Sequence, residues 1–128
     1  EQTAAGFTDV VELWIVGIKN FILNLPPLYE SISLILYNEM FLNAKCRDFV
    51  LNTLFTVQKD VTEMLLEDLL KRGMIKTINT RITAEQYVYM LYGLDIENKI
   101  HAIKGSSLDS IQKNLFSHIT HFIEQIKK

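Results

Sequence analysis

The sequence contains few residues that would cross-link or break the chain. Among its 128 residues are one cysteine, two prolines and five glycines. The single cysteine, Cys46, excludes an internal disulfide. A lone thiol fits a reducing compartment, so we expect a cytoplasmic protein. The two prolines are adjacent, and Pro26-Pro27 is predicted to end a helix because proline cannot donate the next backbone hydrogen bond.

The sequence also lacks a strong charge of either sign. Its formal net charge is −2 and it shows no large basic patch, so this part of the chain is not expected to bind nucleic acid by itself. The apolar run Phe7–Leu25 has the length of a membrane span, but Asp9, Glu12 and Lys19 interrupt it, which favours an amphipathic core helix. No signal peptide is recognisable, and a first residue other than methionine is what a fragment of a longer protein would show.

The main positive signal in the sequence is helical periodicity. With 48% hydrophobic and 22% charged residues, the composition is ordinary for one globular domain with a sizeable core. The chain is organised around Arg47–Arg72, which predicts a helix roughly 39 Å long that Gly73 closes as a left-handed C-cap. One apolar stripe is expected to pack against the other helices: Val50, Leu54, Val57, Val61, Met64 and Leu65. Further apolar residues widen it on the flanks: Leu51, Phe55, Leu66, Leu69 and Leu70.

The same periodicity predicts further helices around this one. They span Thr8–Leu23, Pro27–Met40, Thr83–Leu94 with a continuation to about Lys104, and Leu108–Ile126. Thr83 and Gln86 have the spacing of a capping box, and a serine after Gly105 can cap the last helix. No segment competes as a strand. The sequence therefore predicts one all-α domain over residues 1–128, an antiparallel bundle of five or more helices, with residues 1–6 as a linker or frayed end.

Aromatic and methionine side chains on several helices could line an adaptable apolar pocket. The predicted ligand-binding set is Trp14, Phe21, Tyr29, Tyr37, Met40, Phe41, Phe55, Met64 and Met90. The tyrosine hydroxyls, Asn38, Glu39 and Gln58 could supply the few polar contacts that a ligand needs. The alternative is that these residues simply fill the core, which for any one of them is the better interpretation.

Residues with catalytic or metal-binding chemistry are sparse. His118, His121 and Glu124 follow each other at spacings of three, which could place three ligands near one metal ion, but a polar helix face is the simpler interpretation. Lys45 and Arg47 could lower the pKa of the Cys46 thiol, yet no histidine lies close in sequence. Phosphate-binding loops, nucleophile elbows and zinc-type cysteine pairs are absent from the sequence. We therefore expect no enzyme, no metal and no cofactor, with a metal-using bundle enzyme as a minor alternative.

The last two long helices carry wide apolar stripes that could pair with a second copy of the chain. The predicted dimer-interface residues are Tyr87, Leu91, Leu94, Leu108, Ile111, Leu115, Ile119, Phe122 and Ile126. Two alternatives stay open: these stripes are satisfied within one monomer, or the last helix docks a different protein, which would make the chain a helical interaction module.

The order of these features resembles the C-terminal effector domain of TetR-type transcription regulators, roughly from Phe7 to Ile126. The resemblance is carried by a series of segments: Pro26-Pro27 opening a helix that ends in Tyr37-Asn38-Glu39-Met40, the break Asn43-Ala44-Lys45, the long helix ending in Leu70-Lys71-Arg72-Gly73-Met74-Ile75, a helix from Thr83-Ala84-Glu85-Gln86 to Met90-Leu91-Tyr92-Gly93-Leu94, and an amphipathic last helix. It is a likeness of pattern, since the diagnostic helix-turn-helix of the family lies in an N-terminal part that this sequence does not contain.

The resemblance implies a function as well as a fold. A TetR-type effector domain would form a homodimer through the last two long helices and hold a small, mostly apolar effector among the middle helices. Effector binding would shift the helix predicted at Thr8–Leu23, which would link this domain to the DNA-reading domain of a repressor. The partners expected are therefore a second copy, a small apolar or amphipathic effector, and DNA through the missing N-terminal domain, with no membrane.

Overall fold

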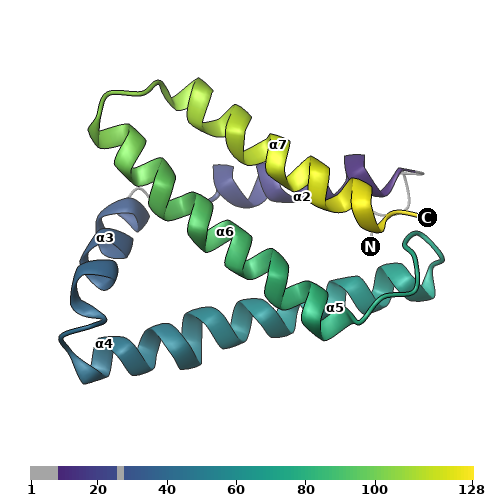
Figure 1. Cartoon of the computed structure of the whole chain (residues 1–128), viewed down its shortest axis with the longest axis horizontal. Coiled ribbons are helices and arrows are strands. Elements are labelled where there is room, and N and C mark those ends of the chain that lie inside the picture. The colour runs from purple at the N-terminus through teal and green to yellow at the C-terminus, as the bar shows by residue number, and fades with distance from the viewer. Residues whose placement is uncertain (1–8, 26–27) are drawn as a thin grey trace.

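The computed structural model describes residues 9–25 and 28–128 and is all-α over that part of the chain, which confirms the predicted helical bundle (Figure 1). The helices are α2 (Val10–Leu23), α3 (Tyr29–Glu39), α4 (Ala44–Phe49), the π-helix η1 (Val50–Phe55), α5 (Thr56–Lys71), α6 (Thr80–Ile103) and α7 (Leu108–Ile126). The one β-type pairing recorded for these residues is an isolated antiparallel bridge between Ile75 and Lys127. The predicted break at Pro26-Pro27 lies outside the described residues.

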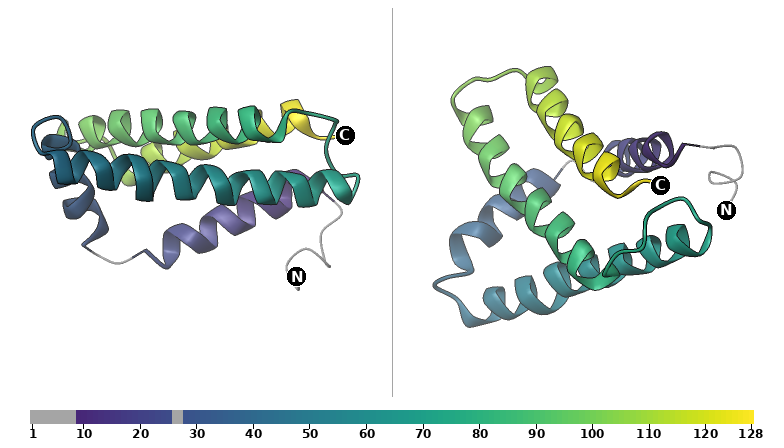
Figure 2. Two further views of the ribbon diagram at one scale, coloured as in Figure 1. Left: turned by 90° about the horizontal axis from the view of Figure 1, so that it is seen from below. Right: turned by 45° about the vertical axis from the view of Figure 1, so that its right-hand side comes forward.

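The helices form a layered bundle rather than a ring. α4, η1 and α5 follow end to end as one long rod, α6 crosses that rod, and α7 returns antiparallel to α6 (Figure 1). α2 packs against α7 and lies behind it in the view of Figure 1, and below it in the left panel of Figure 2. α3 connects α2 to the start of the rod. Among the described residues, no helix combines the length and the apolar character that a membrane span requires.

The long helix was predicted in essentially the right place but has a different interior. Asn43 caps its start, because the Asn43 side chain accepts hydrogen bonds from the backbone N–H groups of Lys45 and Cys46 at 2.9 and 3.2 Å. Gly73 adopts φ 71° after its end, which confirms the predicted left-handed cap. The π-helical turn was not predicted. At its end, the hydroxyl of Thr56, the first residue of α5, donates to the Leu51 carbonyl at 2.8 Å, five residues earlier.

The expected apolar stripe of this helix is only partly right. Val50 is buried and Leu54 is half-buried. Val57, Val61, Met64 and Leu65 are exposed, and the buried residues of α5 are instead Thr62, Leu66 and Leu69. The helix is apolar on more than one side, so periodicity alone could not tell which side the neighbouring helices cover. The π-helical turn adds a second reason, because one extra residue in a turn rotates every later side chain relative to a regular α-helix.

The core lies between α2, α5, α6 and α7. Its fully buried residues include Leu66, Ile119 and Ile123, and Ile75 from the α5–α6 loop also packs into it. Two helices are also joined by a polar contact within this core, since the indole Nε1 of Trp14 donates to the Tyr87 hydroxyl at 2.9 Å. The two rings meet edge to face with centroids 5.3 Å apart. This contact fixes α2 to α6.

The starts of α6 and α7 show which capping predictions hold. The predicted capping box at Thr83 is wrong, because α6 begins at Thr80 and the Asn79 side chain accepts from the Ile82 N–H at 2.9 Å. The helix then runs on to Ile103, as the longer alternative allowed. The serine cap of α7 is confirmed, since Ser107 Oγ accepts from the Ser110 N–H at 3.1 Å.

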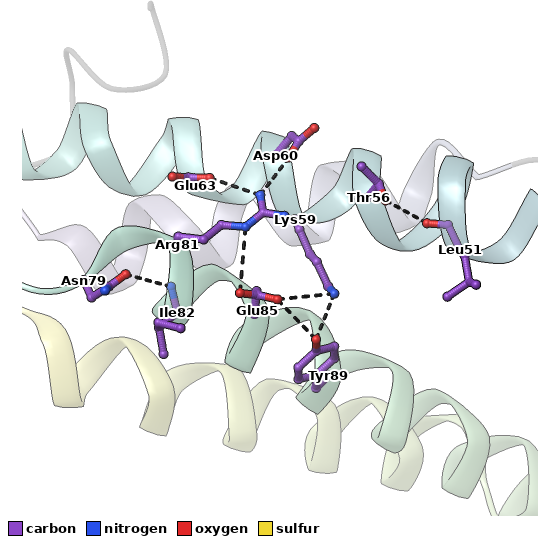
Figure 3. Close-up of polar contacts among 10 residues, drawn as sticks. All are labelled: Leu51, Thr56, Lys59, Asp60, Glu63, Asn79, Arg81, Ile82, Glu85 and Tyr89. Atoms are coloured by element: carbon purple, nitrogen blue, oxygen red, sulfur yellow. Dashed lines mark hydrogen bonds and ion pairs between the residues drawn. The ribbon is translucent and has the colours of Figure 1, made fainter.

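Polar side chains join the outer sides of α5 and α6 (Figure 3). Arg81 contacts Asp60 at 2.7 Å, Glu63 at 3.1 Å and Glu85 at 3.8 Å. Lys59 Nζ donates to the Tyr89 hydroxyl at 2.8 Å and lies 3.4 Å from Glu85. Partly exposed ion pairs each contribute at most about 1 kcal/mol, but a connected set of them fixes how the two helices lie against each other.

Candidate functional site

The predicted ligand-binding residues do not form one pocket. Trp14 is buried in the core, where its indole already bonds to Tyr87. Phe21, Phe41 and Met64 are exposed on different helices. Met40 and Met90 are half-buried, and Met90 packs against the core described above. What remains of the predicted set is Tyr29, Tyr37 and Phe55, and these lie where α3 and η1 approach α6.

The site at this junction, which we call the Tyr37–Asp95–Lys99 cluster, includes two aromatic rings in contact. The Phe55 ring of η1 lies against the Tyr92 ring of α6, with centroids 4.3 Å apart and planes tilted by 37°. From α3, the Tyr37 hydroxyl donates to Asp95 Oδ2 at 2.6 Å. Three separate segments of the chain therefore contribute side chains to one small region.

The polar centre of the cluster is an ion pair on α6. Lys99 Nζ donates to Asp95 Oδ1 at 2.9 Å, and the Lys99 side chain is only 8% exposed. The ammonium group also lies 5.8 Å from the centroid of the Tyr37 ring, within the range of a cation–π contact. Asp95 thus accepts from two donors, one on each of its oxygens, which offsets the cost of burying this charged pair.

The tyrosines of the cluster stay protonated under all physiological conditions. Burial, the hydrogen bond to Asp95 and the negative charge of that carboxylate together raise the pKa of Tyr37 well above its ordinary value. Burial raises the pKa of Tyr92 to about 12, with smaller effects from Tyr29 and Asp95. The cluster therefore brings neutral tyrosine hydroxyl groups, one lysine ammonium and aromatic rings together in one region.

Sequence reasoning missed the α6 members of this cluster. Tyr92, Asp95 and Lys99 are spaced three and four residues apart, so they share one face of a helix, and that signal was available. The polar groups that the sequence did suggest lie elsewhere: Asn38 and Glu39 are exposed. The missed information was the position of α3, which brings Tyr37 to this face.

Two open depressions of the surface involve other residues. One is lined by Asp9, Val10, Gly73, Met74, Lys127 and Lys128. The other runs along α7 and is lined by Lys113, Phe116, Ser117, Thr120, His121 and Glu124. Neither includes any residue of the predicted ligand-binding set. Within residues 9–25 and 28–128, no group of three or more histidine, cysteine, aspartate or glutamate side chains is arranged to hold a metal ion, and this includes His118, His121 and Glu124.

The predicted dimer-interface residues mostly pack inside one copy of the chain. Tyr87, Leu94, Ile119 and Ile126 are buried in the monomer. Leu91, Leu115 and Phe122 are half-buried against the core. Ile111 is half-buried as well. Leu108 alone of that set is exposed. The apolar stripe of α7 faces α2 and α6, so the monomer itself covers it, and the dimer stays a prediction that needs another surface.

The chain was compared with protein-family models, with curated proteins and with solved structures, and none of them matches. The function must therefore be inferred from the arrangement of the described residues and from the order of the helices.

Proposed function

We propose that this chain is the effector-sensing and dimerisation domain of a TetR-type transcription repressor. The observation that carries the proposal is the Tyr37–Asp95–Lys99 cluster, which lies among the middle helices and joins α3 to α6 through a 2.6 Å hydrogen bond. The order of helices along the chain and the antiparallel α6–α7 pair also support it (Figure 1). In this proposal the DNA-reading helix-turn-helix belongs to a part of the protein that precedes α2.

The effector is a small molecule with an apolar body and one or two hydrogen-bonding groups. The rings of Phe55 and Tyr92 supply the apolar contact, and Tyr37 and Lys99 supply donors. A ligand acceptor competes with Asp95 for these two donors. The donor groups of Tyr37 and Lys99 are already partly shielded from water. A matching ligand therefore forms hydrogen bonds with them without burying further polar groups of the protein.

The signal begins with α3, which is held weakly. Its apolar side chains Ile32, Leu34 and Ile35 are exposed, and Ser33 is the one residue of α3 in the buried class among those whose burial is described. A helix with so few buried apolar contacts opens or shifts at low free-energy cost. An effector that separates Tyr37 from Asp95 therefore displaces α3, and α3 follows α2 along the chain. α2 is the helix that would lead to the DNA-reading domain.

The test is binding of an uncharged apolar fluorophore, N-phenyl-1-naphthylamine, whose emission rises in an apolar site. The wild-type chain should bind it, and Tyr92→Ala and Phe55→Ala should each weaken binding at least tenfold. Met64→Ala is the matched control, because Met64 is an exposed apolar residue of α5 outside the cluster. Equal binding by all four proteins, or no binding by the wild type, contradicts the proposed site.

A further inference from the structure

The hydrogen bond that joins α3 to α6 can break without disturbing the ion pair beside it. The Tyr37 hydroxyl donates to Asp95 Oδ2 at 2.6 Å, whereas Lys99 Nζ donates to the other carboxylate oxygen, Oδ1, at 2.9 Å. Asp95 and Lys99 both belong to α6, one helical turn apart, so their contact does not depend on the position of α3. A ligand that enters between Tyr37 and Asp95 therefore separates one donor from one acceptor.

Both of these groups need a new partner when they separate. Tyr37 is half-buried, and the Asp95 side chain is only 32% exposed. Polar groups that are shielded from water cost free energy when they have no hydrogen bond, and the cost is larger for a charged group. A ligand that binds here must accept from the Tyr37 hydroxyl and donate to the Asp95 carboxylate at the same time.

An amide-type group has both properties and no net charge. In a carboxamide, a lactam or a urea, the carbonyl oxygen accepts a hydrogen bond and the adjacent N–H donates one. Such a group adds no charge to the Asp95–Lys99 ion pair. A carboxylate also accepts from Tyr37, but it has no proton to donate, and it adds a second negative charge beside Asp95. An ester has the acceptor alone and leaves Asp95 Oδ2 unpaired.

The apolar part of the ligand has a place next to this polar pair. Tyr92 precedes Asp95 by three residues on α6, which puts the two side chains on one helix face with Cβ atoms about 5–6 Å apart. The Tyr92 ring contacts the Phe55 ring at a centroid distance of 4.3 Å, and both residues are only half-buried. An apolar body attached to the amide-type group can therefore lie against the exposed parts of these rings.

We propose that Asp95 is the specificity-determining residue of the Tyr37–Asp95–Lys99 cluster and that the effector is an uncharged molecule with an amide-type group. This group inserts between Tyr37 and Asp95, and the apolar body lies against Phe55 and Tyr92. Asp95 rejects carboxylates, because an unfavourable charge contact with the wrong ligand contributes to specificity as much as a good contact with the right one. The inference rests on the proposed function and names the chemical class of its effector.

Three probes that share a naphthalene ring test this selectivity: 1-naphthylacetamide, methyl 1-naphthylacetate and the 1-naphthylacetate ion. Their affinities are measured at neutral pH by displacement of N-phenyl-1-naphthylamine. The wild type should bind the amide about tenfold more tightly than the ester or the carboxylate, which is the effect of one hydrogen bond to a charged group. Equal affinity for the amide and either of the other probes, or no displacement by the amide, overturns the inference.

Asp95→Asn tests the role of the carboxylate itself. It removes the negative charge and leaves the ammonium group of Lys99, so the carboxylate probe should bind as tightly as the amide or more tightly. Glu85→Gln is the matched control, because Glu85 is another carboxylate of α6 that lies beside a lysine, 3.4 Å from Lys59, but outside the cluster (Figure 3). It should keep the wild-type preference. Retention of that preference in Asp95→Asn, or its loss in Glu85→Gln, overturns the inference.

The inference and the proposed function can fail separately. Circular dichroism checks that Asp95→Asn folds, and if it does not, the three probes on the wild type still decide. If N-phenyl-1-naphthylamine binds in a way that depends on Phe55 and Tyr92 but the probes show no selectivity, the proposed site stands and the amide-type effector is wrong. If the wild type does not bind N-phenyl-1-naphthylamine, the proposed site and the inference are both wrong.

Discussion

Tyr37→Phe tests whether one side chain holds α3 to α6. The substitution keeps the ring and removes the hydroxyl that donates to Asp95 at 2.6 Å. Hydrogen bonds to charged groups contribute about 1.5–3 kcal/mol, and since Tyr37 is only half-buried we take the lower end, about 1.5 kcal/mol. Asp95 keeps its bond to Lys99, so no charge is left unpaired. Because about 1.4 kcal/mol corresponds to a factor of ten, the amide groups of α3 should exchange roughly tenfold faster.

Hydrogen–deuterium exchange read by mass spectrometry measures the exchange rate of the backbone amides separately for each helix. Peptides covering α3 should gain deuterium faster in Tyr37→Phe, while peptides covering α7, whose Ile119 and Ile123 are fully buried, should not change. Tyr89→Phe is the control, since it removes a hydroxyl that bonds to Lys59 and Glu85 instead. Unchanged exchange in α3, or a uniform acceleration across all helices, would refute the claim that α3 is a separately held element.

Two further predictions concern stability. Leu66→Ala should lower the free energy of unfolding by about 2–5 kcal/mol, because it leaves a cavity in a fully buried site. Met64→Ala, on the exposed side of α5, should change the free energy of unfolding by less than about 1 kcal/mol. Urea denaturation of the two variants measures both changes. Burial raises the pKa of Tyr87 from 10.0 to about 12, so above pH 10 the unfolded chain loses a proton that the folded chain keeps. Stability should therefore fall as the pH rises from 10 toward 12, and Tyr87→Phe should make that fall shallower; equal slopes in urea titrations of the two proteins would contradict it.

Helix periodicity and end signals were enough to predict the fold class and most helix positions. A left-handed glycine such as Gly73 and a capping serine such as Ser107 act locally, so the sequence alone is sufficient to recognise them. The π-helical turn at Val50–Phe55 was not predictable, because it depends on one carbonyl finding a donor five residues away. The sequence also could not show which of the two apolar sides of α5 is buried, because that depends on where α6 crosses the helix.

The candidate site was predicted only in part, for a related reason. Tyr37 and Phe55 were among the expected ligand-binding residues, but the pattern that suggested them was simply aromatic content, which also selected the core residue Trp14 and the exposed Phe41. A site between helices is defined by which faces meet. Asp95 was overlooked because a charged residue is ordinarily assigned to a solvated helix face, and the position of α3, which brings the Tyr37 hydroxyl to it, is not visible in the sequence.

If the chain is the proposed sensor, its pattern of burial separates the part that gives stability from the part that would respond to a ligand. The fully buried residues belong to α5, α6, α7 and the loop that carries Ile75, whereas α3 presents isoleucines to solvent and meets α6 through a polar contact. A ligand can shift an equilibrium only by its difference in affinity for the two states, so it moves an element with few buried apolar contacts more readily than one held by a core. α2 is buried at one end and exposed at the other. Val10 and Trp14 at its start are buried, whereas Phe21 near its end, next to α3, is exposed. A displacement of α3 is therefore expected to tilt α2 about the Trp14–Tyr87 contact rather than to detach it.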